Sequence, residues 1–475
     1  MKAFCLLLLI VSSFVTNAQD NDLTTRMDAY MQAMNEQGLS ASVICMKDGK
    51  RVLKKAYGFS DREKQILNTP QTVFTVGSIT KQFTAAAIMK LEMQGKLKTT
   101  DLMSRYISDV PADKKDITLH QLLTMNAGLV EAFGDDYEAL NRDAFLKRAM
   151  ESTLVSPPGT EYLYSNVNYS ILGSIVELVS GKDYETYCRE NLWLPAGMNF
   201  TGYVLPDWSK MNISVGYNKQ DENTGTSLAK NWDKDGPYWN LKCNGGVLST
   251  CDDMYRWYLA LQGETVLSAA AKTKMYTPHI AEGPEGQSHY GYGWAIFKTM
   301  RNTRLITHNG GNGIFFADYL NYEDENTFVF LQSNASKRGQ QDVAWELGRM
   351  MLIPGYEPEI KSYNPKPTTV DEVEKQFNTK TISALIGFAT GKYTGTTETF
   401  VQDNLGPGLL QSMPLAEHTG MFDMLKKDLT GATFLELLQA GNEIEFHFTM
   451  PDGQTMQVIT ELNMEGKIRG LRFGE

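Results

Sequence analysis

The order of strand-like and helical segments restricts the folds open to this chain more than any other feature of its sequence. The stretch ASVICM-KDGK-RVLKKAYGF predicts a β-hairpin around Asp48-Gly49, and three further strand-like runs come much later, as RLITH, FFADYLNY and TFVFLQSN. Residues 78–260, between them, are mainly helical segments broken by loops. Strands from the two ends of this region therefore have to meet in one antiparallel sheet.

Helices are predicted at both ends of the same region. Residues 21–37 space their apolar side chains as an amphipathic helix does, and QQDVAWELGRMML follows the last strand-like run. We therefore expect an α/β (α+β) fold over residues 19–356: an antiparallel sheet flanked by an N-terminal and a C-terminal helix, with an all-helical region inserted.

A second domain is expected after residues 357–372, a charged, proline-containing stretch that is typical of a linker. The segment NEIEFHFTM-PDG-QTMQVITEL alternates apolar and polar residues on both sides of a turn, and KIRGLRF adds a strand. These patterns predict a small antiparallel β domain over residues 373–475.

The first 18 residues are typical of a secretory signal peptide. Lys2 precedes the apolar residues 3–11, and Thr16-Asn17-Ala18 provides a cleavage site of small residues. No later apolar run is long enough to span a bilayer. We therefore expect export to the periplasm or the medium, with no integral membrane segment once the signal is removed.

The net charge and the spacing of possible metal ligands exclude several classes of partner and cofactor. The net charge is −11, with no Lys- or Arg-dense segment, so nucleic acid is not an expected partner. Neither His-Glu-x-x-His nor Cys-x-x-Cys occurs, and the six histidines are scattered, so we expect no metal and no cofactor. A disulfide between Cys243 and Cys251 and the oligomeric state both stay open.

Ser78 and Lys81 stand three residues apart where a helical pattern begins, in VGSITKQFTAAAIMKLEM. That spacing places both side chains on one face, and a helix start suits a developing anion at the serine. A desolvated lysine there can lose its proton and act as a base. Ser227 and Lys230 repeat the spacing in a polar loop with no helix after it, so spacing alone does not distinguish catalysis from helix capping.

Two later segments contain further candidate site residues. Tyr164 and Asn166 lie in a loop before an apolar helix, and a phenol near a lysine ammonium is expected to have a lowered pKa. His308-Asn309-Gly310-Gly311 ends a predicted strand, where glycines allow close approach of a substrate backbone. Either element alone also fits a structural role, and His418-Thr419-Gly420 is a second, more distant His-x-Gly.

Taken in order, Ser-x-x-Lys, Tyr-x-Asn and His-x-Gly make the chain similar to the serine β-lactamase and penicillin-binding protein superfamily, specifically its class C β-lactamase-like serine hydrolases. The segments PPGTEYLYSNVNYSILGSIVELVSG, NGGVLSTCDDMYRWYLAL and YGYGWAIF extend the resemblance over residues 21–355.

The resemblance implies a role for each matching residue. Ser78 is the nucleophile, Lys81 its activating partner and Tyr164 the base for acylation and deacylation. Asn166 positions substrate and Lys81, and the backbone N–H groups of Ser78 and Gly311 form the oxyanion hole. His308, Asn309 and Gly310 take the substrate-binding place of the family's Lys-Thr-Gly triad.

The triad departs from the family pattern, because histidine replaces the lysine and Asn309 replaces the threonine. Histidine is mostly neutral at pH 7, so the permanent cation that suits a β-lactam carboxylate is missing. The expected function is an acyl-serine hydrolase for a small ester, amide or D-amino-acid peptide, including cell-wall-derived peptides. The alternatives are a β-lactamase or D-Ala-D-Ala carboxypeptidase, and a non-catalytic penicillin-recognising or peptidoglycan-binding protein. The resemblance also implies that the C-terminal domain is lipocalin-like.

Overall fold

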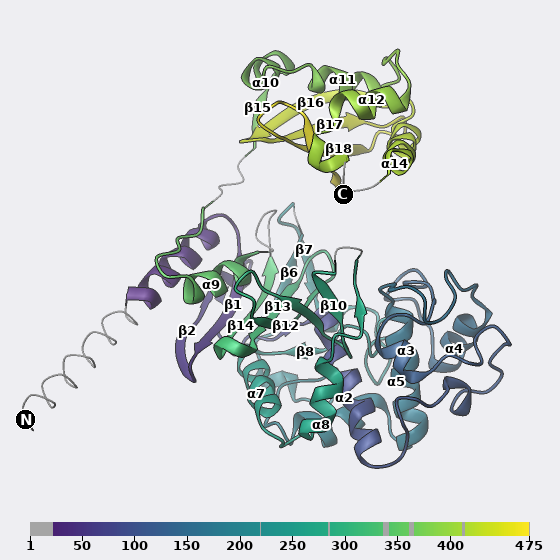
Figure 1. The fold of residues 1–475 in the computed structure, drawn as a ribbon. Helices are drawn as coiled ribbons and strands as arrows, with labels where there is room; N and C mark the ends of the chain where they lie inside the picture. Colours follow the sequence, from purple (N-terminus) through teal and green to yellow (C-terminus); the bar gives the residue numbers. More distant parts are fainter. Residues whose placement is uncertain are drawn as a thin grey trace, which may run out of the picture. The chain divides into compact units, whose positions relative to one another are not determined.

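The computed structural model describes residues 22–218, 220–283, 286–335, 342–360, 365–410 and 414–474. The chain divides into two compact units, Met1–Ile360 and Lys361–Glu475 (Figure 1). The predicted signal peptide, residues 1–18, lies outside the described residues.

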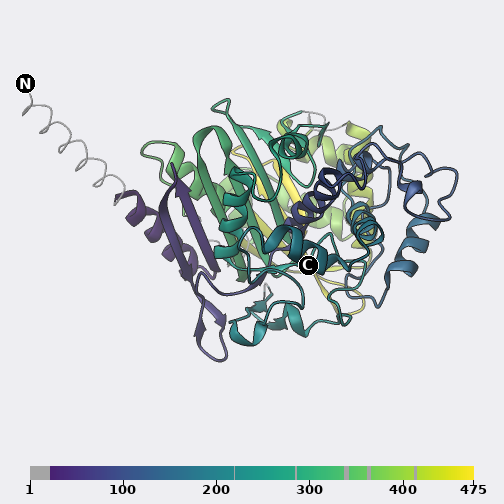
Figure 2. The same cartoon turned by 90° about the horizontal axis from the view of Figure 1, so that it is seen from below.

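The first unit is built on one eight-stranded antiparallel sheet, in the order β2-β1-β14-β13-β12-β11-β10-β9. The strands come from the two ends of the unit: β1 (Ser40–Lys47), β2 (Lys50–Tyr57), β9 (Ile280–Ala281), β10 (Ser288–Tyr290), β11 (Ala295–Lys298), β12 (Arg304–Gly311), β13 (Phe316–Tyr322) and β14 (Thr327–Ala335). Figure 2 shows the purple β1–β2 hairpin beside the green strands of the late sequence. The mixed α/β fold with a large antiparallel sheet, expected from the segment order, is confirmed.

The hairpin forms where the Asp48-Gly49 turn predicted it, with φ of 50° and 72° at these two residues. β1 pairs with β2 on one side and β14 on the other, so nearly all its side chains are buried. Val43 and Cys45 pack in one core with the helix over residues 22–36 and α9 (Val343–Leu352), while Ile44 and Met46 pack in the other core, against the helical region. The sheet is therefore covered on both faces.

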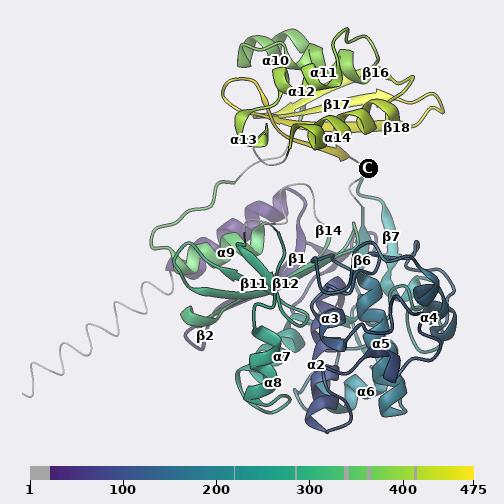
Figure 3. The same ribbon diagram turned by 45° about the vertical axis from the view of Figure 1, so that its right-hand side comes forward.

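The inserted helices gather beside one face of the sheet, as the labels in Figure 3 show. They are α2 (Thr80–Met93), α3 (Leu119–Leu123), α4 (Arg142–Glu151), α5 (Asn166–Ser180), α6 (Tyr184–Cys188), α7 (Cys251–Gln262) and α8 (Ala269–Tyr276). Short strand pairs β3 (Phe59–Asp61) with β4 (Ile66–Leu67), β5 (Phe74–Thr75) with β8 (Leu248–Ser249), and β6 (Val215–Tyr217) with β7 (Asn223–Thr226) join the helical region to the sheet.

Buried side chains surround α2 on every side, from Thr80 to Met89. It packs closely on α5, whose Gly173 lies so near the Cys243 thiol that a Cβ there would meet Sγ at 2.1 Å. α2 is thus the central helix of the unit, which fixes the position of the residues at its N-terminus.

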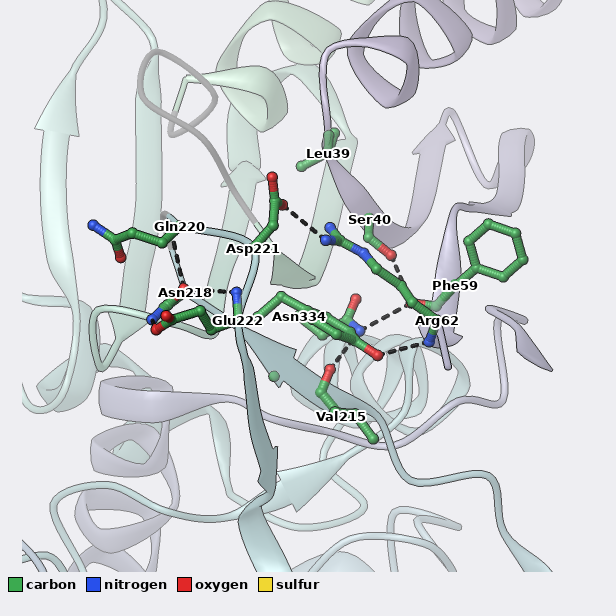
Figure 4. Close-up of polar contacts among 12 residues, drawn as sticks. Leu39, Ser40, Phe59, Arg62, Val215, Asn218, Gln220, Asp221, Glu222 and Asn334 are labelled. Atoms are coloured by element: carbon green, nitrogen blue, oxygen red, sulfur yellow. Dashed lines mark hydrogen bonds and ion pairs between the residues drawn. The ribbon is translucent and has the colours of Figure 1, made fainter. Parts of the chain in front are cut away.

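Asn334, near the end of β14, ties three separate segments together (Figure 4). Its Nδ2 donates to the carbonyl oxygens of Phe59 at 3.0 Å and Val215 at 2.7 Å, and Ser40 Oγ donates to the same Phe59 oxygen at 2.8 Å. Arg62 also bonds Asp221, which belongs to the β6–β7 turn, at 2.8 Å. A buried amide here satisfies backbone groups that the main sheet leaves unpaired.

The second unit has its own sheet and its own core. Its strands, in the order β15-β16-β17-β18-β19, are β15 (Lys366–Thr368), β16 (Thr433–Ala440), β17 (Glu443–Thr449), β18 (Thr455–Leu462) and β19 (Ile468–Gly474). The helices described before β16 are α10 (Val370–Phe377), α11 (Thr381–Ala389), α12 (Thr397–Asn404), α13 (Pro407–Leu410) and α14 (Leu415–Asp428). Apolar residues of these helices pack against the sheet.

The small antiparallel β domain predicted over residues 373–475 has its antiparallel sheet, but an open sheet with helices on it does not fit the lipocalin-like resemblance. The strands from Glu443 onward lie where alternation predicted them, but residues 370–428 form helices whose buried side chains, such as Phe388 and Phe422, cover one face of an open sheet. β15 and the start of α10 also lie inside the stretch 357–372 that was expected to be a linker. Thr369 caps α10 with a capping box to Glu372, a start signal that the charge of this stretch concealed.

All four described cysteines, Cys45, Cys188, Cys243 and Cys251, are free and buried. Cys243 and Cys251 are thus not joined in a disulfide. Among the described residues no helix is long and apolar enough to cross a membrane.

Candidate active site

Ser78 lies in a short 3₁₀ turn, η1 (Gly77–Ile79), that leads directly into α2. Gly77 has a φ of +53° and Gly310 of β12 lies against the same turn. A Cβ on Gly310 would meet Val76 O at 2.1 Å and the Ser78 nitrogen at 2.6 Å. Only glycine at this point lets the strand approach the turn so closely, which brings the Ser78 N–H and the end of β12 together.

Lys81 is fully buried and sits one turn further along, at the bottom of the site. Its Nζ lies 2.9 Å from Ser78 Oγ, 2.7 Å from Asn166 Oδ1 and 2.9 Å from the carbonyl oxygen of Asn244. Burial lowers the pKa of Lys81 to about 7, because the low-polarity surroundings penalise the ammonium, and the charges of Asp136 and Glu131 offset this only in part. Lys81 is thus half-deprotonated near neutral pH.

An ammonium at Lys81 can donate to all three of these oxygens, and a neutral amine fits the same positions with different roles. A neutral lysine has two N–H donors and one lone pair. Asn166 Oδ1 and Asn244 O can only accept from it, so they take both donors. The lone pair is then left for the Ser78 hydroxyl proton.

Tyr164 stands over Lys81, with the Lys81 Nζ 4.8 Å from the centre of its ring. Burial raises the pKa of Tyr164, and the hydrogen bond between the Tyr164 and Ser78 side chains lowers it by less. The pKa lowering expected from the neighbouring ammonium is therefore wrong for the free protein. Burial destabilises the Tyr164 phenolate more than a half-protonated Lys81 stabilises it.

His308 is buried in β12, facing the helical region. Its Nε2 lies 3.0 Å from Tyr290 OH, its Nδ1 lies 2.6 Å from Asn309 O, and its ring centre is 6.4 Å from that of Tyr164. Burial, together with the Lys81 charge, lowers the pKa of His308 to about 3. This histidine is therefore neutral at physiological pH and does not replace a lysine cation.

Asn309 is the one predicted site residue whose side chain leaves this face of the sheet. Successive residues of a strand point to opposite faces, and Asn309 is paired directly with Asp318 on β13, on the side away from His308. β11 pairs with β12 only as far as Thr307, so among the described strands none pairs with residues 308–311 on that side. The Gly311 nitrogen lies close to Gly77, because a Cβ on Gly77 would meet it at 2.6 Å.

The structure also adds residues that sequence reasoning missed. Asn244 contributes a backbone carbonyl oxygen to Lys81, and a backbone group carries no sequence signal. Asp136 and Tyr137 line the small pocket at Ser78, in a polar loop without a recognisable motif. The Ser227–Lys230 copy is not an equivalent site, because Lys230 Nζ donates to Thr224 O at 3.0 Å instead. His418 belongs to α14 in the second unit.

Two spaces adjoin these residues. A small pocket of about 60 Å³ is bordered by Ser78, Asn166 and Asn244 together with Asp136 and Tyr137. A cavity of about 370 Å³ has Tyr164 and His308 in its wall. In the described ranges, no group of three or more His, Cys, Asp or Glu is placed to hold a metal ion.

A comparison with protein-family models matches the Beta-lactamase family over residues 25–349. Among curated proteins, the chain is 31% identical over 266 residues to a Bacillus subtilis protein, PbpX, which is named only provisionally as a penicillin-binding protein. That alignment covers 55% of this chain and 63% of PbpX, so the chain spans just under two thirds of that relative. Protein flp of Staphylococcus aureus (strain MW2) is 23% identical, over 78% of this chain and 72% of its own length.

Similar solved structures also include penicillin-binding proteins and their homologues. A penicillin-binding protein from Bacillus halodurans, 26% identical, superposes with a TM-score of 0.59 over 67% of this chain and 98% of its own. An octameric penicillin-binding protein homologue from Pyrococcus abyssi, 22% identical, has a TM-score of 0.63 over 95% of this chain and 98% of its own. At that identity the second match shows the fold alone.

Proposed function

The chain belongs to the β-lactamase family, and from this premise we propose that it is an exported serine hydrolase that works through an acyl-serine. The observation that carries the proposal is the buried Lys81, whose pKa lies near 7 and whose Nζ is 2.9 Å from Ser78 Oγ. In its neutral form this lysine donates to two permanent acceptors and turns its lone pair toward Ser78, which is the arrangement of a general base. The proposed substrate is a small ester, amide or D-amino-acid peptide.

The proposed first half-reaction is acylation. Ser78 Oγ attacks the substrate carbonyl carbon while its proton moves to the neutral Lys81 amine. The oxyanion accepts hydrogen bonds from the backbone N–H groups of Ser78 and Gly311. As the bond to the leaving group breaks, Tyr164 gives its proton to that group and takes the Lys81 proton in return, so the phenol keeps the high pKa that burial gives it.

Deacylation repeats the sequence with water. Water attacks the acyl carbon, its proton moves to Lys81 through Tyr164, and the carboxylic acid leaves as Ser78 recovers its proton. This division of roles modifies the expectation from sequence, in which Tyr164 was itself the base. The lowered pKa of Lys81 and the raised pKa of Tyr164 favour the lysine.

A β-lactamase or D-Ala-D-Ala carboxypeptidase is the second candidate, favoured by the family and by the names of its relatives. A neutral His308 weighs against it, since these substrates carry a carboxylate that a permanent cation recognises. A non-catalytic penicillin-recognising or peptidoglycan-binding protein is the third. Such a protein would bind its ligand, or keep it bound to Ser78, without turnover.

The test uses the mature chain, residues 19–475, and its Ser78→Ala variant. Each is incubated with a fluorophosphonate, a p-nitrophenyl ester and a chromogenic cephalosporin, and both turnover and protein mass are followed. We expect the wild type to bind the fluorophosphonate covalently and to hydrolyse the ester, with both lost in Ser78→Ala. No covalent mass increase with any reagent would refute the proposal. Turnover of the cephalosporin alone would favour the second candidate, and a stable adduct without turnover the third.

A further inference from the structure

The large cavity beside the candidate catalytic residues is acidic and aromatic. It reaches around the free edge of β12, from Tyr164 and His308 on one face of the sheet to Asn309 and Asp318 on the other. Its described wall includes three carboxylates, from Glu282, Asp318 and Asp342, and no lysine or arginine. Aromatic rings complete it; those on the Asp318 side are Phe297, Phe316 and Trp345.

Asp318 is the unusual member of this wall. It is only 2% exposed, and its Oδ2 has no hydrogen-bond partner in the described part of the chain. A buried carboxylate oxygen without a partner is costly, and in a cavity wall such an atom is open to a hydrogen-bond donor or a cation. Burial and the nearby Asp342 raise the pKa of Asp318 well above its usual value, an effect that a bound cation would reverse.

Asp342 stands at the N-terminus of α9 and is exposed. Its side chain makes no capping hydrogen bond to the helix, so it is not committed to that role. Glu282 already accepts hydrogen bonds from the Tyr162 and Ser288 hydroxyl groups. Among the described residues of the wall, the carboxylates open to a ligand are therefore Asp318, deep in the cavity, and Asp342, nearer to solvent.

The two spaces are bordered by different candidate catalytic residues. Tyr164, the proposed proton donor to the leaving group, borders the large cavity, whereas Asn166 and Asn244 border the small pocket. A leaving group must lie beside the group that protonates it, so it belongs in the large cavity. The small pocket, of about 60 Å³, then holds a short acyl group.

We propose that the large cavity receives the leaving group of the substrate, and that Asp318 and Asp342 select a leaving group carrying a positively charged nitrogen. This rests on the proposed acyl-serine function. Carboxylates beside aromatic rings bind quaternary and protonated amines by charge attraction and cation–π contact. An anionic leaving group, such as an amino acid with a free carboxylate, would meet like charges there. The selection is thus opposite in sign to that of a D-Ala-D-Ala carboxypeptidase.

The test measures protection of Ser78. The labelling rate of the mature protein by a small neutral fluorophosphonate is followed at increasing concentrations of choline, of its uncharged isostere 3,3-dimethylbutan-1-ol, and of 3,3-dimethylbutanoate. We expect choline to halve the labelling rate at a concentration at least about fivefold lower than the isostere does. The anion should not protect. Equal protection by choline and the isostere, or none by choline, would overturn the inference.

Three variants assign the preference to residues, each normalised to its own unprotected rate. Asp318→Asn should abolish the advantage of choline, and Asp342→Asn should reduce it. Asp143→Asn, at a side chain 86% exposed on α4, removes the same charge elsewhere and should keep it. Because Asp342 is exposed, its variant remains informative if Asp318→Asn fails to fold. An undiminished preference for choline in Asp318→Asn or in Asp342→Asn would also overturn the inference.

These outcomes separate the two proposals. Labelling without any preference for choline would leave the serine hydrolase standing and remove only the cationic leaving group. A wild type that the fluorophosphonate does not label at all would remove both.

Discussion

At the scale of single residues, the candidate site depends on two opposite effects of burial. Burial lowers the pKa of Lys81 to about 7 and raises that of Tyr164, so both groups are held uncharged close to Ser78. Burial likewise keeps His308 neutral. An uncharged base and an uncharged acid can exchange a proton with a substrate without first separating charge in a poorly solvated site.

The first prediction concerns pH. Below pH 7 Lys81 is protonated and cannot accept the Ser78 proton, so the rate of Ser78 acylation should rise with pH and reach half its maximum near pH 7. The measurement is the rate of fluorophosphonate labelling from about pH 5 to about pH 9. His308→Gln should keep this midpoint, because the pKa of His308 lies at about 3. A midpoint that moves with His308, or a flat profile, would contradict the assignment of the base.

The second prediction separates Tyr164 from Lys81. Tyr164→Phe removes the proton donor but keeps the ring over Lys81. It should lower kcat/KM for an alkyl ester by about 10²- to 10⁴-fold, because an alkoxide must be protonated as it leaves. A p-nitrophenyl ester should lose far less in acylation, since its phenolate leaves without a proton. Burst kinetics on both esters provide the comparison; equal losses would point to a positioning role instead.

At the scale of elements, the site exists because β12 and η1 touch at glycines. Gly77 has a positive φ, and Gly310 leaves no space for a side chain against Val76 and Ser78. This contact joins segments far apart in the sequence, and it aligns the N–H groups proposed for the oxyanion.

The third prediction is therefore that Gly310→Ala damages the site more than the fold. A Cβ 2.1 Å from Val76 O forces strand and turn apart, which should cost about 1–3 kcal/mol of unfolding free energy and slow labelling of Ser78 by about 100-fold. Gly263→Ala is the matched control, because its Cβ would meet only Thr265 Oγ1, at 3.9 Å. Thermal unfolding and labelling rates measure the two effects. A variant labelled at the wild-type rate would show that the contact is dispensable.

Sequence reasoning at this scale succeeded where local rules decide the outcome. Ser78 and Lys81 had to share a face because of their spacing, and Asp48-Gly49 had to turn because its residues accept a positive φ. Strict alternation along β12 also implies that His308 and Asn309 face opposite sides of the sheet. The rise in the Tyr164 pKa was out of reach, since it depends on how deeply the fold buries the phenol.

At the scale of the whole molecule, two units each have a separate hydrophobic core. The predicted sheet and inserted helices of the first unit followed from segment order, because its strands are long and strongly apolar. In the second unit, the helices over residues 370–428 were not predicted, although α10 is amphipathic and α14 is 14 residues long, so helical periodicity was present in the sequence. Buried residues of these helices, such as Val373, Phe400 and Phe422, pack in the same core as residues of the sheet.

The fourth prediction uses this division. All the candidate catalytic residues lie in the first unit, so a fragment of residues 19–360 should fold and label at Ser78 within about threefold of the full chain. Residues 361–475 should fold separately, with their own cooperative melting transition. Circular dichroism melts of both fragments and a labelling assay of the first provide the data. An unfolded or unreactive first fragment would mean that the second unit is required for the site.

The unpaired edge of β12 sets a limit on the size and stiffness of any substrate. Four residues, 308–311, offer a free strand edge of roughly 13 Å. A chain can lie along such an edge only while its own backbone is extended and unpaired. Folded proteins present such segments mainly at termini and exposed loops. Under the proposed function, the substrates that fit this edge are therefore small molecules and flexible chain segments.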